Sequence, residues 1–296
     1  MMSTPNRDKP MSVLVVGHRG QLGRDMMLAA AAKGFAVHGE DFPGIDITRL
    51  DSVTKAVARY RPAAVINCAA FTAVDQCESE TAKAFAVNAD GAKNLALAAA
   101  ECGAKLVHLS TDYVFDGMKK TPYVETDKPN PLSVYGKSKL EGEKLLAETY
   151  DRCFIVRVAW LYGTRGNNFL KTIRSRAQKC AVTGEPVKVV NDQIGTPTYT
   201  MHVCRQLLSL MQSEHFGIYH GTNEGSCSWF DFASAIVKAY AIKANVVPCT
   251  TAEFPRPAPR PANSVLENER LKKLLMNTMP RWEMGLEEYL EEEKKI

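Results

Sequence analysis

The chain has 296 residues, enough to bury a large core in one elaborated domain or in a large domain with a smaller one. Its 37 basic and 33 acidic residues give a net charge of +4, too small to indicate nucleic acid or an acidic membrane surface as a partner. No apolar run reaches the roughly 20 residues that a membrane-spanning helix needs. The composition is that of an ordinary soluble globular protein.

The eight cysteines form no CxxC pair, and no group of cysteines and histidines has the spacing of zinc ligands. We predict that all eight are reduced thiols in a cytoplasmic protein that holds no metal. Residues 1–10 are polar and do not form a signal peptide, so we expect a disordered leader before the folded part begins at Met11.

Short apolar runs alternate with helical segments through the first half of the chain. The predicted strands span residues 12–16, 35–39, 63–67, 105–110 and 153–158. The predicted helices span residues 24–33, 50–60, 81–102 and 132–147. Such alternation with short connections predicts a parallel sheet covered by helices on both faces. The predicted fold class is therefore α/β, with a doubly wound sheet of the Rossmann type.

The alternation loosens after residue 161. Helices are predicted at residues 169–179, 202–212 and 228–240, and short strands at residues 187–190 and 217–220. Residues 254–261 contain too many prolines for a helix and are predicted to form an extended loop. We expect a nucleotide-binding domain at residues 11–161. Residues 162–296 are expected to form mainly a smaller, discontinuous substrate-binding domain, with some segments returning to the large sheet.

A glycine loop, Gly17-x-x-Gly20-x-x-Gly23, joins the first predicted strand to the first predicted helix. Glycines let a backbone turn sharply and approach a pyrophosphate, whose charge is favourable at a helix N-terminus. The loop predicts dinucleotide binding, and three turn glycines without a ligand are the alternative. Glu40 and Asp41 end the second strand, and a carboxylate there favours NAD, whereas Arg19 could meet the 2′-phosphate of NADP, so the preference between NADH and NADPH stays open.

Tyr135 and Lys139 lie four residues apart in a predicted helix and therefore project from one face. A nearby ammonium lowers the pKa of a phenol, which is about 10 in isolation. The pair is thus a candidate for proton transfer to or from a substrate oxygen. By themselves, the two residues fit an exposed helical tyrosine and a solvated lysine better than a catalytic pair.

Taken together, the glycine loop, Asn67-Cys-Ala-Ala70, Ser110-Thr111 and Tyr135-x-x-x-Lys139 resemble the extended short-chain dehydrogenases/reductases. Further motifs narrow the resemblance to the dTDP-4-dehydrorhamnose reductase family. These motifs are Ser110-Thr-Asp-Tyr-Val-Phe115, Tyr135-Gly-Lys-Ser-Lys-Leu-Glu-Gly-Glu143, Arg157-x-x-Trp160-x-Tyr162, Gly166-Asn-Asn-Phe169, Asn191-Asp-Gln-x-Gly195-x-Pro197-Thr198 and Arg260-Pro261-x-Asn263-Ser264. The resemblance implies reduction of the 4-keto group of dTDP-4-dehydro-β-L-rhamnose by a nicotinamide hydride.

The resemblance also implies a role for each matching residue. Tyr135 would donate the proton, Lys139 would lower its pKa, and Thr111 would bind the substrate carbonyl. The implied cofactor-binding residues are Gly17, Arg19, Gly20, Gln21, Leu22, Gly23, Glu40, Asp46, Ile47, Ala69, Ala70, Phe71, Thr72, Tyr135 and Lys139. The implied substrate-binding residues are Thr111, Asp112, Tyr113, Tyr135, Trp160 and Arg260.

Several of these residues have structural alternatives. Thr111 could cap local backbone at a strand end, Trp160 could be part of the core, and Arg260 could form a salt bridge instead of binding a diphosphate. Some bacterial relatives dimerise around a magnesium ion held by glutamates, but here Asp25 and Met201 occupy two of those positions. We therefore expect a monomer or a weak homodimer without a magnesium bridge. The acidic run at residues 287–293 is expected to be a solvated helix face.

Two other functions compete with the reductase. One is a non-catalytic regulatory subunit like the β subunit of methionine adenosyltransferase, which the intact Thr111, Tyr135 and Lys139 set disfavours. The other is an epimerase or dehydratase acting on another nucleotide sugar. Dehydratases commonly carry an acidic residue beside the catalytic threonine, and Asp112 follows Thr111 here.

Overall fold

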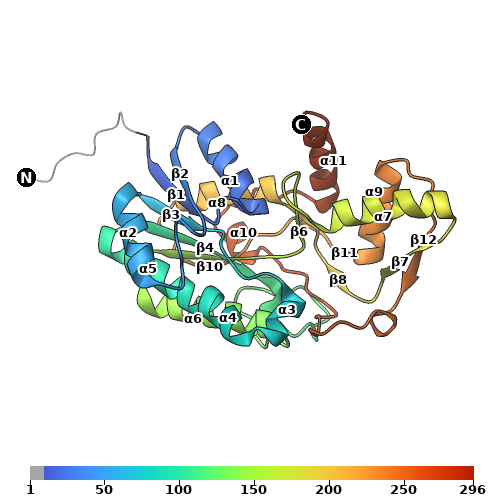
Figure 1. Cartoon of the computed structure of the whole chain (residues 1–296), viewed down its shortest axis with the longest axis horizontal. Helices are drawn as coiled ribbons and strands as arrows, with labels where there is room; N and C mark the ends of the chain where they lie inside the picture. The colour runs from blue at the N-terminus through green and yellow to red at the C-terminus, as the bar shows by residue number, and fades with distance from the viewer. Residues whose placement is uncertain (1–9) are drawn as a thin grey trace, which may run out of the picture.

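The computed structural model describes residues 10–296, so the predicted leader lies almost entirely outside the described residues. The central sheet has six parallel strands in the spatial order β10-β5-β4-β3-β1-β2 (Figure 1). The bounds are β1 Ser12–Val16, β2 Ala36–Glu40, β3 Ala64–Asn67, β4 Lys105–Thr111, β5 Cys153–Val158 and β10 Gly217–His220. The strand order reverses between β1 and β3, where doubly wound sheets bind ligands. The predicted fold class is confirmed.

Helices cover both faces of this sheet because its strands carry apolar side chains on both sides. In β1, Val13 and Val15 belong to one core cluster, and Leu14 and Val16 belong to the other. The first cluster is completed by α1 (Gln21–Ala32) and α8 (Thr200–Met211). The second is completed by α2 (Leu50–Tyr60), α5 (Gly91–Cys102) and α6 (Val134–Thr149).

The predicted helix at residues 81–102 is three consecutive segments. They are α4 (Thr81–Phe85), a π-helical turn at Ala86–Asp90 and α5. A short helix before them, α3 (Val74–Ser79), was not predicted, because its six residues are too few for a clear apolar period. Gly103 ends α5 in a left-handed conformation, with φ of +68°.

A smaller group of elements packs around its own apolar core, at the right of Figure 1. Its helices are α7 (Phe169–Thr183), α9 (Trp229–Ala239) and α11 (Trp282–Glu293), and the parallel pair β7 (Val187–Val190) and β12 (Val246–Cys249) completes it. Two-residue strands pair nearby: β6 (Leu161–Tyr162) with β9 (Thr198–Tyr199), and β8 (Ile194–Gly195) with β11 (Cys227–Ser228). Because α8 and β10 pack with the large sheet, this group is discontinuous in sequence. The domain boundary at residue 161 stays a prediction.

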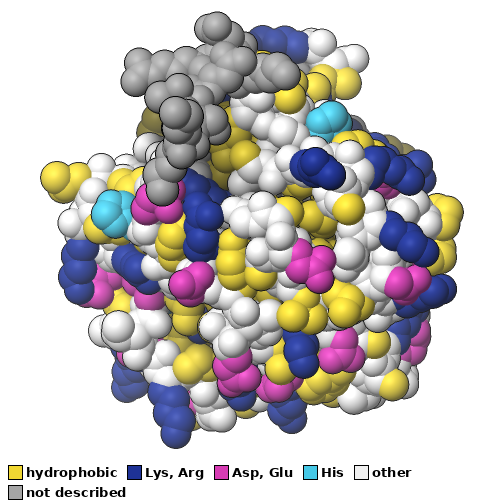
Figure 2. Space-filling view, turned by 90° about the vertical axis from the view of Figure 1, so that its left-hand side faces the viewer, with side chains coloured by type: hydrophobic (Ala, Val, Ile, Leu, Met, Phe, Trp, Pro, Cys, Tyr) yellow, Lys and Arg dark blue, Asp and Glu magenta, His cyan; other side chains and the backbone are white. Residues whose placement is uncertain are grey.

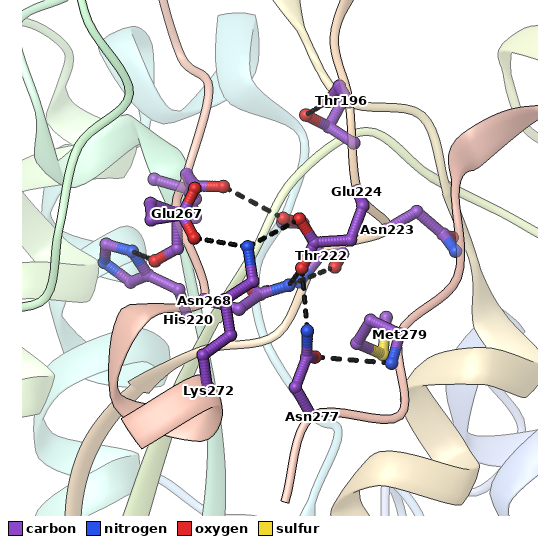
Figure 3. Close-up of polar contacts among 12 residues, drawn as sticks. Thr196, His220, Thr222, Asn223, Glu224, Glu267, Asn268, Lys272, Asn277 and Met279 are labelled. Carbon is purple, nitrogen blue, oxygen red and sulfur yellow. Dashed lines mark hydrogen bonds and ion pairs between the residues drawn. The ribbon is translucent and has the colours of Figure 1, made fainter. Parts of the chain in front are cut away.

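Polar contacts fasten the C-terminal segment to the turn that follows β10. The Glu224 carboxylate accepts hydrogen bonds from Asn268 at 2.9 Å and Asn277 at 2.8 Å, and it pairs with Lys272 at 2.8 Å (Figure 3). Lys272 lies in the short helix α10 (Glu269–Lys273). One glutamate therefore ties α10 and the segment after it to the edge of the large sheet.

The acidic run in α11 is not simply a solvated face. Three of its glutamates form ion pairs with arginines from other elements: Glu288 with Arg205 at 2.9 Å, Glu292 with Arg165 at 2.7 Å and Glu293 with Arg174 at 2.8 Å. The expectation was wrong for these residues and holds for Glu287 and Glu291, which are exposed. Sequence alone does not reveal the distant arginines that approach this helix.

On the face that Figure 2 shows, basic and acidic side chains are interspersed among apolar ones rather than gathered into a patch of one sign. This distribution agrees with the small net charge. Within residues 10–296, no helix combines the length and the apolar character needed to cross a bilayer. All eight cysteines lie in this range and are free thiols, as predicted.

Candidate active site

The glycine loop is a tight turn between β1 and α1. Gly17 has φ of +79°, and a Cβ there would lie 2.6 Å from the backbone nitrogen of Ala69. A Cβ on Gly23 would lie 2.1 Å from the carbonyl oxygen of Gly17. Both positions therefore require glycine: a side chain at Gly17 would push apart the loops after β1 and β3, and a side chain at Gly23 would collide with the backbone of the glycine loop itself. Gly20 is the N-cap of α1 and gives it no side-chain cap, so the N–H groups of the first turn remain available to an anion.

A cavity of about 570 Å³ opens beside this loop. Among the predicted cofactor residues, it is lined by Gly17, Gly20, Asp46, Ile47, Ala69 and Ala70. Asp41 also lines it, whereas the Glu40 carboxylate accepts hydrogen bonds from Tyr60 at 2.6 Å and Arg59 at 3.3 Å. Arg19 is exposed, and its backbone N–H donates to Asp41. Of the two carboxylates that end the second predicted strand, Asp41 therefore lines this cavity, whereas Glu40, the one predicted to bind the cofactor, is held by Tyr60 and Arg59.

A second cavity, of about 490 Å³, holds the predicted catalytic residues. Thr111, Tyr135 and Lys139 line it together with Gly20, Gln21 and Leu22 of the glycine loop and with Thr72. Thr111 ends β4, and Tyr135 and Lys139 lie in the first turns of α6, whose N-cap Ser133 accepts a hydrogen bond from Gly136 N–H at 3.1 Å. Phe71 lies elsewhere, where its backbone binds the Asn88 side chain.

Lys139 does not lower the pKa of Tyr135 as expected. Burial raises the pKa of Tyr135 above its ordinary value, and a hydrogen bond with Thr111 offsets this only in part. The Lys139 ammonium instead donates to the Leu109 carbonyl at 2.6 Å and lies 3.3 Å from Nε2 of His108. Burial lowers the pKa of Lys139 to about 8, while Glu143 raises it. The tyrosine is therefore a protonated phenol at neutral pH.

The Thr111 hydroxyl is held by its neighbours. It donates to Asp112 Oδ1 at 2.9 Å and accepts from the Tyr113 N–H at 3.2 Å, so the expected local capping role is present. Burial raises the pKa of Asp112 to about 6. The Tyr113 ring meets the Tyr135 ring edge-on, with centroids 5.6 Å apart. These contacts fix the orientation of the three groups that face the cavity.

A third cavity, of about 400 Å³, lies between the two groups of elements. Its wall includes Tyr113 and four basic side chains, which are Arg176, Lys188, Arg256 and Arg260. Arg260 also forms a salt bridge with Asp75 at 2.5 Å, so the structural alternative for this residue is present. Sequence reasoning did not single out Arg176 or Lys188. Their common signal is positive charge on segments that are distant in the chain, which one sequence does not connect.

Trp160 lines the catalytic cavity and contacts the smaller group of elements, the one that contains α7, α9 and α11. Its ring stacks on Trp229, with centroids 3.4 Å apart, and both residues line the catalytic cavity. The backbone of Trp160 has φ of +46°, a conformation that is unusual for a bulky residue. A Cβ on Gly195 would lie 2.3 Å from the Trp160 ring, so that glycine makes room for the indole.

Asp25 is fully buried and pairs with a cation from its own chain. Its carboxylate accepts from Arg165 at 2.8 Å and from the Thr200 hydroxyl, and Arg165 also pairs with Glu292 at 2.7 Å. Within residues 10–296, no cluster of three or more histidine, cysteine, aspartate or glutamate side chains has a geometry suited to a metal ion. The predicted oligomeric state is a separate question that these contacts do not address.

Comparison with known proteins gives the family. The model of the RmlD substrate binding domain family matches residues 11–295. The dTDP-4-dehydrorhamnose reductase of Aggregatibacter actinomycetemcomitans is 39% identical over 93% of this chain and 96% of its own length. The crystal structure of a dTDP-4-dehydrorhamnose reductase from Clostridium acetobutylicum superposes with a TM-score of 0.91 at 45% identity, covering 95% of this chain and 99% of the other.

The enzyme of that name from Bacillus anthracis, whose structure was solved in complex with NADP, also superposes with a TM-score of 0.91. It is 40% identical and covers 96% of this chain and 99% of its own. These similarities extend over nearly the whole chain, and they confirm the resemblance predicted from the motifs. The chain belongs to the dTDP-4-dehydrorhamnose reductase family.

Proposed function

We propose that this protein reduces the 4-keto group of dTDP-4-dehydro-β-L-rhamnose to give dTDP-β-L-rhamnose, with NADPH or NADH as the reductant. The observation that carries the proposal is that Thr111, Tyr135 and Lys139 share one cavity with the glycine loop. A proton donor and a nucleotide-binding turn therefore face the same space. The cytoplasm is the proposed location, and a monomer or weak homodimer is the proposed state.

The residues around the glycine loop fit a dinucleotide. The backbone packs so closely in and beside the glycine loop that Gly17 and Gly23 have no room for a side chain, which leaves the loop backbone free to approach a pyrophosphate. Asp41, Asp46 and Ile47 line the adjoining cavity, where the adenosine would lie. A bound nicotinamide cofactor would supply the hydride. The NADP complex of the Bacillus anthracis relative supports this assignment.

Tyr135 is proposed to donate the proton that completes the reduction. Reduction of a ketone places negative charge on its oxygen, and a phenol that keeps its proton at neutral pH can both stabilise and protonate that oxygen. The Thr111 hydroxyl would exchange its bond to Asp112 for one to the same oxygen. Lys139 lines the same cavity and, in its charged form, would add positive charge beside them.

The third cavity is proposed to hold the diphosphate and base of the substrate. Arg176, Lys188, Arg256 and Arg260 give it positive charge, and arginine side chains match the geometry of phosphate oxygens. Tyr113 lines both this cavity and the catalytic one, so a sugar attached to the diphosphate would reach Tyr135. In this arrangement the smaller group of elements is the substrate-binding domain.

The test is the loss of reduced-nicotinamide absorbance when the purified protein is given dTDP-4-dehydro-β-L-rhamnose. Tyr135→Phe removes the acid and should lower turnover by about 10²- to 10⁴-fold while nucleotide binding persists. Tyr150→Phe is the matched control, since Tyr150 donates to the Ala104 carbonyl outside the cavities. A folded protein that binds NADPH or NADH but reduces none of the substrate would contradict the proposal.

The competing functions predict other products. A regulatory subunit would bind nucleotide without turnover, and an epimerase or dehydratase would convert a nucleotide sugar with no net oxidation of NADPH. Asp112 beside Thr111 is the feature that favours a dehydratase. Product analysis by mass spectrometry separates these outcomes, because net reduction adds two hydrogens to the sugar.

A further inference from the structure

Behind the catalytic cavity, three polar side chains form a chain of contacts inside the sheet. Asn67 ends β3, His108 lies in β4 and Lys139 lies in α6, and each is at most 2% exposed. Asn67 Nδ2 lies 3.0 Å from His108 Nδ1, and His108 Nε2 lies 3.3 Å from Lys139 Nζ. The proposed reaction assigns no role to Asn67 or His108.

The orientation of the Asn67 amide fixes the tautomer of His108. Asn67 Oδ1 accepts a hydrogen bond from the Ala69 N–H at 3.0 Å, so the NH₂ group of the amide must face the imidazole. An NH₂ group can only donate, and His108 Nδ1 must therefore accept. In a neutral imidazole the remaining proton is then on Nε2. Turning the amide over would set its NH₂ against the Ala69 N–H, which is also a donor.

The proton on His108 Nε2 points at Lys139. An ammonium group has donors and no acceptor, so His108 and a charged Lys139 would present two donors to each other. A neutral amine has a lone pair that can accept the Nε2 proton and still donate to the Leu109 carbonyl, 2.6 Å away. The chain of hydrogen bonds is therefore complete only when Lys139 is neutral.

We propose that His108, oriented by Asn67, is a positioning residue that favours the neutral amine of Lys139. Lys139 then exchanges its proton near neutral pH instead of carrying a fixed charge. This inference deepens the proposed function, on which its catalytic meaning rests: a lysine that gains and loses a proton near neutral pH can return one to the cavity after each reduction. The contacts themselves do not depend on the substrate.

The other charged groups around Lys139 do not cancel the preference for its neutral amine. Glu143, one turn along α6, favours the ammonium, but its carboxylate is already bound by Arg157 at 2.7 and 2.9 Å and by the Ser110 hydroxyl at 2.5 Å. Arg157 comes from β5 and brings a compensating positive charge. The net outcome is a pKa of about 8 for Lys139, with burial as the largest cause. Burial and Lys139 together hold the pKa of His108 well below its ordinary value, so the imidazole is neutral.

Tyr135 is a further titratable group of the same helix, and it shares the catalytic cavity with Lys139. Its phenol is neutral at the pH where Lys139 titrates, because burial raises its pKa. It therefore adds no charge that would hold the ammonium in place. Among the described residues, the Glu143 carboxylate favours the charged form, and the Leu109 carbonyl accepts a hydrogen bond from either form.

The first test reads the tautomer directly. Protein with ¹⁵N-labelled histidine is observed by NMR at neutral and mildly alkaline pH, and the His108 signals are assigned by their loss in His108→Asn. We expect the proton on Nε2 and none on Nδ1. The opposite tautomer would overturn the inference, whether or not the protein reduces a sugar.

The second test follows Lys139 itself. Protein with ¹³Cε-labelled lysine is titrated between about pH 6 and pH 10, with Lys139→Met for assignment. His108→Gln can turn a carbonyl oxygen toward Lys139, and His108→Asn keeps an acceptor for Asn67 but removes the facing N–H. Replacing a donor contact by an acceptor should raise the Lys139 midpoint by about one pH unit. His215→Gln, at an exposed histidine, should leave it unchanged.

An unchanged midpoint in folded His108→Gln or His108→Asn would refute the inference and leave His108 a packing residue. If one variant does not fold, the other variant and the tautomer measurement still decide. In the active enzyme, the alkaline limb of the kcat/KM profile should shift upward by the same amount as the Lys139 midpoint. Absence of reduction would contradict the proposed function, while the NMR results would test His108 independently.

Discussion

The ion pair between Glu143 and Arg157 lies inside the large sheet and allows a quantitative prediction. Arg157 donates to Glu143 through Nε at 2.9 Å and Nη2 at 2.7 Å, and the two side chains are 3% and 2% exposed. The Ser110 hydroxyl binds the same carboxylate. Within the described residues, Nη1 of Arg157 already lacks a partner. The guanidinium therefore depends on Glu143 alone for charge compensation.

Glu143→Ala should lower the free energy of unfolding by about 3–5 kcal/mol, because it leaves an uncompensated charge in a buried site. The lost hydrogen bond of Ser110 adds about 1 kcal/mol. The double variant Glu143→Leu/Arg157→Leu should cost less than Glu143→Ala, since it removes both charges and fills the space with apolar atoms.

Urea unfolding followed by circular dichroism measures these differences. Asp51→Asn is the control, because Asp51 pairs with Arg49 at the surface and its loss should leave the midpoint unchanged. A loss below about 1 kcal/mol for Glu143→Ala would refute the reasoning, since it would mean that water or a local shift readily solvates Arg157. Simple additivity of the two single leucine variants would refute it as well, because a coupled pair cannot give that result.

Three further predictions concern the catalytic cavity and the glycine loop. Burial raises the pKa of Asp112 from 3.8 to about 6, so the folded state binds the extra proton and the free energy of unfolding falls as pH rises between these values. Asp112→Asn should therefore stabilise the protein at pH 7 by up to about 3 kcal/mol. Thermal melts should show this gain vanishing below about pH 4. Gly23→Ala should weaken NADPH binding measured by calorimetry more than tenfold, because its Cβ would collide with the Gly17 carbonyl; unchanged affinity would show that the loop adapts. Thr111→Val should lower turnover about 100-fold and Thr111→Ser should restore most of it, whereas equal rates would exclude a role for the hydroxyl.

Much of the large sheet was predictable because its signals are local. The runs at β1, β3 and β5 are apolar at all but one position each, as is typical of strands buried on both faces, and the glycine turn after β1 has a backbone need that only glycine meets. The three predicted catalytic residues do meet in one cavity: Thr111 lies at the carboxyl end of β4, and Tyr135 and Lys139 lie one turn apart on α6. These features depend on nearby residues and on the regular geometry of the fold.

The features that were not predictable depend on contacts between distant segments. Nothing in Glu292 indicates that Arg165 will approach it, and nothing in Lys188 places it beside Arg260. The position of Asp41 beside the cavity, with Glu40 bound to Tyr60, is decided by where helix α2 ends. Single-sequence periodicity identifies the element that carries a residue, but not which partner meets its side chain.

The revised ionisation of Tyr135 suits reduction better than the sequence-based expectation did. A lysine that made the phenol acidic would place part of it in the phenolate form, which can accept a proton but cannot give one to a developing alkoxide. Burial does the opposite and keeps the phenol protonated, while Lys139, with a pKa of about 8, is the group that changes charge near neutral pH. In the proposed reaction the site would separate two tasks: Tyr135 would donate, and Lys139 would set the pH range over which the donor is renewed. Since His108 faces Lys139 and not Tyr135, its replacement should move that pH range without abolishing the donor.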